Sequence, residues 1–161
     1  MYKSEKGITF MVLVITIIVL VIIGTTAAGA AISSYKNAKV KLYMKEMDLI
    51  KEKVLLYEEK NKVNSEEPLV NIGRPVQDDD KAVSVMEKLE AENKLINISS
   101  EGDKYKNYRY LANADVISVL NVKDLKESRD IIVDIVSKRV YSIAPVEFEK
   151  QLYYSADDIR D

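Results

Sequence analysis

The hydrophobic pattern divides the chain into an apolar beginning and an amphipathic remainder. Residues 8–32 are almost continuously apolar, and no charged side chain lies between Gly7 and Tyr35. A helix over residues 8–35 would be about 42 Å long, which exceeds the hydrocarbon core of a bilayer, about 30 Å. Many residues here are β-branched, but lipid favours a helix because every backbone group must bond within the segment. The pattern therefore predicts a transmembrane helix.

After Tyr35 the pattern becomes that of an amphipathic helix. Apolar residues recur at spacings of three and four, with Lys and Glu on the other faces. Because no Pro precedes Pro68 and no Gly lies between Gly29 and Gly73, one helix can continue through residues 33–62. Its buried seam would consist of Val40, Tyr43, Met47, Ile50, Val54 and Tyr57.

Residues 63–161 show the mixed pattern of a small α+β head domain. Residues 61–80 contain two prolines, one glycine and three consecutive aspartates, which predicts a loop. The aspartates lack the alternating spacing of a calcium loop, so we expect one of them to cap a helix that runs to about Lys94.

Short β-like segments follow this helix, and helical turns lie among them. The link at residues 137–139 is short enough for a hairpin. We expect an antiparallel sheet of three or four strands that packs against the long helix, an α+β arrangement. The predicted strands are residues 108–111, 131–136, 140–143 and 151–154, and the predicted helical turns are residues 114–120 and 122–125.

The tyrosines concentrate in the second half of the chain. From Tyr105 onward most of them fall in the predicted strands, where rings can pack half-buried with the hydroxyl in water. Tyr153 and Tyr154 are adjacent on a strand and so point to opposite faces, which predicts that at least one is exposed. We expect this pair to supply a partner contact.

The composition of the chain argues against several kinds of catalytic and metal site. The chain has no His and no Cys, so it lacks the commonest general base, the commonest metal ligand and any thiolate site. Its five glycines, two of them in the apolar run, cannot build a phosphate cradle. We therefore expect no enzyme activity, no catalytic residue, no cofactor, no metal and no small-molecule substrate. A nucleic-acid partner would need a basic patch, and Arg109, Arg129, Lys138 and Arg139 are too dispersed to predict one.

Three interpretations of the N-terminal segment remain open. An ordinary membrane anchor needs only the apolar run. A secretory signal peptide would use Lys3 and Lys6 before the run and Ala28-Gly29-Ala30 as its cleavage site, although its apolar region is unusually long. The third interpretation comes from the junction Lys6-Gly7-Ile8-Thr9-Phe10, a short charged leader that ends in Gly and is followed at once by the apolar run.

This junction resembles the prepilin signal of type IV pilins, pseudopilins and pilin-like proteins of Gram-positive type. In that family a membrane peptidase cuts after the Gly and the new N-terminus is methylated. The resemblance implies cleavage between Gly7 and Ile8, removal of residues 1–7 as a leader peptide, and N-methylation of Ile8. It covers roughly the first quarter of the chain closely and the remainder only in architecture. The assembly helix that it implies, which packs against neighbouring subunits, includes Thr9, Phe10, Val12, Gly24 and Gly29.

Two departures from the family pattern refine the expectation. Most pilins carry a Glu at the position of Val12, where its carboxylate is understood to pair with the N-terminal amine of a neighbouring subunit. Its absence favours a minor pilin over a major one. Where many pilins have a helix-kinking Pro, this chain has Gly24 and Gly29, which permit close approach of helix backbones.

The resemblance implies a structural subunit of a type IV pilus, competence or type II-like secretion system. It would cross the cell membrane once, with the head domain extracytoplasmic, and its partners would be other pilin subunits, prepilin peptidase and membrane lipid. The alternative is a membrane-tethered binding or adhesion module that does not polymerise. Charge alone predicts the opposite orientation, because four lysines at residues 36–45 outnumber the two in the leader.

Overall fold

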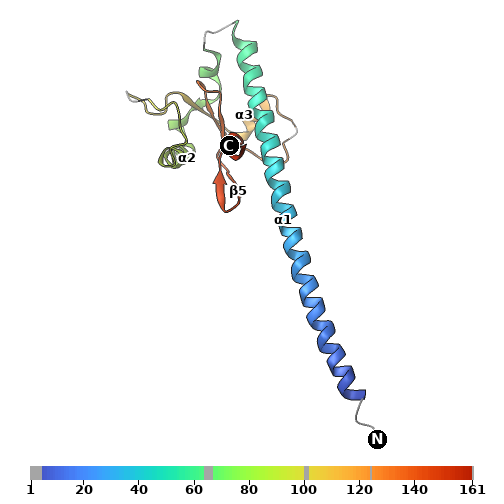
Figure 1. Cartoon of the computed structure of the whole chain (residues 1–161). Coiled ribbons are helices and arrows are strands. Elements are labelled where there is room, and N and C mark those ends of the chain that lie inside the picture. Colours follow the sequence, from blue (N-terminus) through green and yellow to red (C-terminus); the bar gives the residue numbers. More distant parts are fainter. Residues whose placement is uncertain (1–4, 64–66, 100–101, 124, 161) are drawn as a thin grey trace. The chain divides into compact units, whose positions relative to one another are not determined.

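The computed structural model describes residues 5–63, 67–99, 102–123 and 125–160, and the side chains of residues 5–12, 19–33 and 160 lie outside this description. The chain forms two compact units, Met1–Lys39 and Val40–Asp161. Helix α1, Glu5–Asn61, supplies the first unit and the beginning of the second (Figure 1).

In the first unit the described side chains on the apolar run are those of residues 13–18, and all of them are exposed. Among the residues whose side chains are described, no helix is long and apolar enough to cross a membrane. The prediction of a transmembrane helix over residues 8–32 falls largely on side chains outside the description, so it stays a prediction.

The second unit is an α+β structure with a small antiparallel sheet, as the sequence predicts. Its sheet has the order β1-β2-β3-β4, and every neighbouring pair is antiparallel. Strands β5 and β6 pair separately as a two-stranded hairpin. After α1 the elements are η1 Pro68–Asn71, β1 Arg74–Pro75, η2 Val76–Asp78, α2 Asp80–Ala91, β2 Tyr108–Leu111, α3 Asn113–Ser118, β3 Ile131–Asp134, β4 Val140–Ser142, β5 Val146–Phe148, β6 Gln151–Tyr153 and α4 Asp157–Arg160.

The sheet is covered on both faces, which gives this unit three layers. Successive side chains of a strand point to opposite faces. On β3, Ile131 and Val133 belong to the core shared with α1, whereas Ile132 belongs to the core shared with α2. Figure 1 shows the same arrangement, with α1 and α2 on opposite sides of the strands. All four residues of β3 are buried, as expected for a central strand.

The predicted cap is present on α2. The side chain of Asp79 accepts hydrogen bonds from the backbone N–H groups of Lys81 and Ala82 at 3.1 and 3.0 Å. Its other oxygen lies 2.7 Å from a guanidinium nitrogen of Arg74. Helix α2 ends at Ala91, three residues earlier than predicted, because Asn93 adopts a left-handed conformation with φ of 55° and closes the last turn.

Three sequence expectations are corrected by the structure. Residues 151–153 do not join the main sheet but pair with β5, which the sequence pattern does not predict. The fourth strand of the sheet is instead β1, only two residues long. Among residues 122–125, those that are described are not helical, because Asn121 has a φ of 55° and the chain turns away after α3.

Candidate functional site

The seam of α1 lies in the second unit and forms one wall of its core. Val40, Tyr43, Met47, Ile50 and Val54 are buried, and Tyr57 is half-buried against the same core. They pack on residues of β2, β3 and β4 that share one face of the sheet. Burying a large apolar side chain contributes about 1.5–3 kcal/mol, so the seam holds residues 40–57 of the helix firmly on the sheet.

A buried ion pair interrupts this apolar seam. Glu46 of α1 and Arg129, just before β3, are each 3% exposed, and Arg129 Nε lies 2.8 Å from Glu46 Oε2. The other carboxylate oxygen of Glu46 accepts a hydrogen bond from the backbone N–H of Lys126 at 2.6 Å. The guanidinium carbon of Arg129 also lies 4.9 Å from the centre of the Tyr43 ring. Both charges are therefore satisfied by groups within the unit.

Further hydrogen bonds extend this network to α3. The backbone N–H of Arg129 donates to the side-chain oxygen of Asn113 at 2.9 Å, and the backbone N–H of Asn113 donates to Asp130 Oδ1 at 2.8 Å. The segment before β3 is thus tied to both helices. These contacts join the segment before β3 to the rest of the unit. No sequence pattern points to Glu46 as a functional residue.

The four basic residues considered for nucleic-acid binding all make contacts within the unit. Arg129 pairs with Glu46 and Glu127. Lys138 lies 2.8 Å from Glu58, and Arg139 lies 3.6 Å from Asp157. Arg109 donates from Nε to the carbonyl of Val70 at 2.8 Å. These contacts hold the loops and helix ends together.

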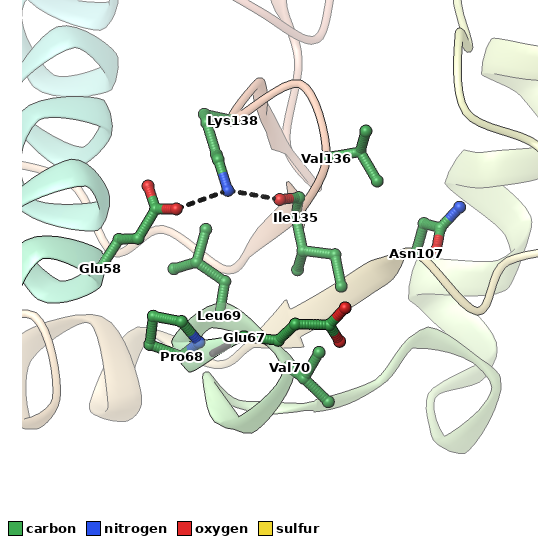
Figure 2. Close-up of a pocket in the computed structure, with 9 residues that line it drawn as sticks. All are labelled: Glu58, Glu67, Pro68, Leu69, Val70, Asn107, Ile135, Val136 and Lys138. Carbon is green, nitrogen blue, oxygen red and sulfur yellow. Dashed lines mark hydrogen bonds and ion pairs between the residues drawn. The ribbon is translucent and has the colours of Figure 1, made fainter. Parts of the chain in front are cut away.

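A cavity of about 260 Å³ lies where α1 ends, between η1 and the turn that joins β3 to β4 (Figure 2). Leu69, Val70 and Ile135 supply apolar walls, and Glu58 and Lys138 stand on one side. Lys138 Nζ donates to the carbonyl of Ile135 at 2.7 Å as well as to Glu58. The volume of the cavity lies just below the range usual for ligand pockets, about 300–1,000 Å³, so it is large enough to receive an apolar side chain.

The two tyrosines proposed for a partner contact have different environments. Tyr154 is 4% exposed and packs in the core beside α2, so it is not available to a partner. Tyr153 is half-buried, its ring lies 6.4 Å from that of Phe148, and its hydroxyl donates to Gln151 at 3.0 Å. The prediction that at least one of the pair is exposed is therefore wrong, since Tyr153 is only partly accessible and Tyr154 is buried, and the partner contact itself stays a prediction.

Burial suppresses the ionisation of several tyrosines. Tyr105 is buried and donates from its hydroxyl to Glu90 at 2.9 Å, and burial together with this carboxylate raises its pKa to about 12. Burial also raises the pKa of Tyr43 and of Tyr141. In each case the neutral phenol is the form that the folded state favours.

We expect alkaline unfolding as a result. Below pH about 10, the ordinary tyrosine pKa, this contribution to stability is fully present, and it is lost as the pH rises toward the folded-state pKa, about 12 for Tyr105. Tyrosinate absorbance should rise in two phases, the later one coinciding with loss of near-ultraviolet circular dichroism. Tyr105→Phe should move that unfolding to higher pH. A single absorbance phase with unchanged dichroism would contradict the prediction.

The N-terminal residues implied by the pilin resemblance lie in α1, but their side chains are outside the description. This applies to the cleavage residues Gly7 and Ile8 and to the assembly residues Thr9, Phe10, Val12, Gly24 and Gly29. Within the described residues, no group of three or more acidic residues is placed to hold a metal ion.

Comparisons of the chain with protein-family models, with curated proteins and with solved structures find no match.

Proposed function

We propose that this chain is a pilin-like structural subunit, a minor pilin or pseudopilin of a type IV pilus, competence or type II-like secretion system. The main support for the proposal is that α1 has two chemically different parts. Its residues 40–57 form a wall of a small α+β core, while its residues 8–32 form an uncharged run of membrane length behind a prepilin-type junction.

In this proposal the two parts of α1 have different tasks. After removal of residues 1–7, the run at residues 8–32 is held in the membrane and then among neighbouring helices, where Gly24 and Gly29 permit close packing. The head domain stays extracytoplasmic. The seam and the buried Glu46–Arg129 pair prevent residues 40–57 from sliding on the sheet, so the head must follow any movement of that part of the helix.

The mature N-terminus tests this proposal. We expect intact-mass and N-terminal peptide mass spectrometry of the chain from native membranes to show a start at Ile8 that carries an added methyl group. Gly7→Val should leave the leader attached, because a bulky side chain replaces the residue at the cleavage site. Gly29→Ala, a change of a glycine far from the junction, should leave the start at Ile8.

Other starting residues would contradict the proposal in different ways. A start at Met1 in the unaltered chain would indicate a plain anchor, and a start near Ala31 would indicate a secreted domain.

The second candidate is a membrane-tethered binding module that does not polymerise. The side-chain-sized cavity at the end of α1 favours it, since such a cavity can receive an apolar group of a partner. Shearing of intact cells separates the two candidates. A filament subunit should be released with surface filaments, whereas a tethered module should remain entirely in the membrane fraction.

A further inference from the structure

The charge along α1 changes where the apolar run ends. Residues 35–45 contain four lysines and no acidic residue, whereas residues 46–60 contain five acidic residues and three lysines. The four lysines, here named the lysine collar, are Lys36, Lys39, Lys41 and Lys45, and all four are exposed. The collar is therefore a purely cationic segment that directly follows a segment without any charge.

The collar lysines have no carboxylate partner in the part of the chain that the structure describes, unlike several other lysines of the protein. Lys51, one turn and a half further along α1, lies 2.8 Å from Asp157, and Lys138 lies 2.8 Å from Glu58. The first acidic residue after the collar, Glu46, is buried against Arg129 and cannot neutralise it. The positive charge of the collar remains available to an external anion.

Tyr35 stands between the apolar run and the collar and is 71% exposed. Tyrosine rings concentrate at the boundary between hydrocarbon and water, because the ring is apolar and the hydroxyl is polar. The order of apolar run, tyrosine and lysines is the order of environments met on leaving a bilayer, from hydrocarbon through the interface to the phosphate groups.

We propose that the lysine collar binds the phosphate groups of anionic lipids at the surface of the bilayer. The inference rests on the proposed function, in which residues 8–32 lie in that bilayer. With Tyr35 at the interface, Lys36 and Lys39 lie within about 6 Å of it along the helix axis, which is inside the Debye length at physiological ionic strength. Lys41 and Lys45 follow Lys39 by two and six residues in the sequence, and both have long, flexible side chains.

Nucleic acid offers phosphates too, but the position of the collar favours lipid. The collar begins four residues after the apolar run, so membrane insertion alone brings it to a layer of phosphates. Each lysine held near an anionic leaflet contributes about 1 kcal/mol of attraction, a factor of about five in local lipid preference. A duplex would have to approach the same lysines beside the membrane surface.

The chain has no Trp, which permits a direct test in the full-length protein. Tyr35→Trp introduces a single indole beside the collar. The protein is reconstituted into phosphatidylcholine vesicles that contain equal fractions of either dansyl-phosphatidylglycerol or dansyl-phosphatidylcholine. We expect energy transfer to the anionic label to be at least about twofold greater than to the zwitterionic label, and to become equal in about 1 M salt.

A matched pair of variants tests whether the collar lysines cause the preference for the anionic label. In the Tyr35→Trp background, replacement of all four collar lysines by Gln should make transfer to the two labels equal, with transfer to dansyl-phosphatidylcholine unchanged. The control replaces four exposed lysines distant in sequence, at Lys60, Lys62, Lys81 and Lys88, and changes the net charge equally. This control should keep the preference for the anionic label.

The outcomes that overturn the proposal are distinct. Equal transfer to both labels in the Tyr35→Trp protein would refute lipid recognition by the collar and leave membrane anchoring intact. Transfer to neither label would show that the segment does not lie in the bilayer, which would refute the proposed function as well. Stronger quenching of the indole by a duplex oligonucleotide than by anionic vesicles would assign the collar to nucleic acid.

Discussion

Replacing Glu46 with Ala is expected to lower the free energy of unfolding by about 3–5 kcal/mol. The change removes the buried carboxylate that pairs with Arg129, a residue only 3% exposed, and leaves this guanidinium only the more exposed carboxylate of Glu127. It also leaves the backbone N–H of Lys126 without its acceptor. Urea unfolding of the full chain in detergent, followed by the near-ultraviolet dichroism of the tyrosines, measures this loss in the α+β unit.

Two further variants define the origin of the effect. Glu52→Ala removes an exposed carboxylate of the same helix and should cost less than about 0.5 kcal/mol. Joint replacement of Glu46 and Arg129 by Leu should cost less than Glu46→Ala alone, because no unpaired charge remains buried. If Glu46→Ala were as mild as Glu52→Ala, the buried pair would not be what fixes the segment before β3 on α1.

Gly73→Ala is expected to destabilise the unit by about 2–4 kcal/mol. Gly73 has a φ of 64°, and a Cβ atom there would lie 2.2 Å from the backbone oxygen of Tyr110 and 2.9 Å from Leu111 Cγ. The backbone oxygen cannot move without disturbing β2, so β1 would have to leave the sheet. The same unfolding measurement applies to this variant.

Gly102→Ala is the matched control. Gly102 has a similar φ of 69°, but nothing lies within 4 Å of a Cβ built on it. Its substitution should therefore show only the cost of the left-handed conformation, about 1 kcal/mol. Equal losses for the two variants would mean that β1 yields to the added atom and that its approach to β2 is not tight.

The elements that could be predicted from the sequence are those with a long or regular local pattern. The seam of α1 repeats over five turns, and β2 and β3 carry apolar residues on both faces, so their positions follow from spacing alone. Strand β1 could not be predicted, because it has only two residues and one of them is Pro75, a residue that usually marks a loop. Its place in the sheet depends on contacts with β2.

The buried pair could not be predicted because its partners are 83 residues apart. Glu46 falls among the polar residues of an amphipathic helix, where a carboxylate normally faces solvent. For Tyr153 and Tyr154, the prediction that they point to opposite faces is correct, but the predicted pairing of their strand is not. The strand forms a hairpin with β5, and Tyr154 is buried in the core beside α2.

Both edges of the four-stranded sheet in the second unit are poorly suited to pairing with a further strand. On one side Pro75 in β1 has no N–H to offer, and on the other the N–H of Ser142 in β4 already donates to the carbonyl of Tyr154 at 2.7 Å. Strand-to-strand addition, the first step of amyloid growth, therefore meets poor templates on both sides. We therefore expect this four-stranded sheet to resist strand-to-strand association even at high protein concentration.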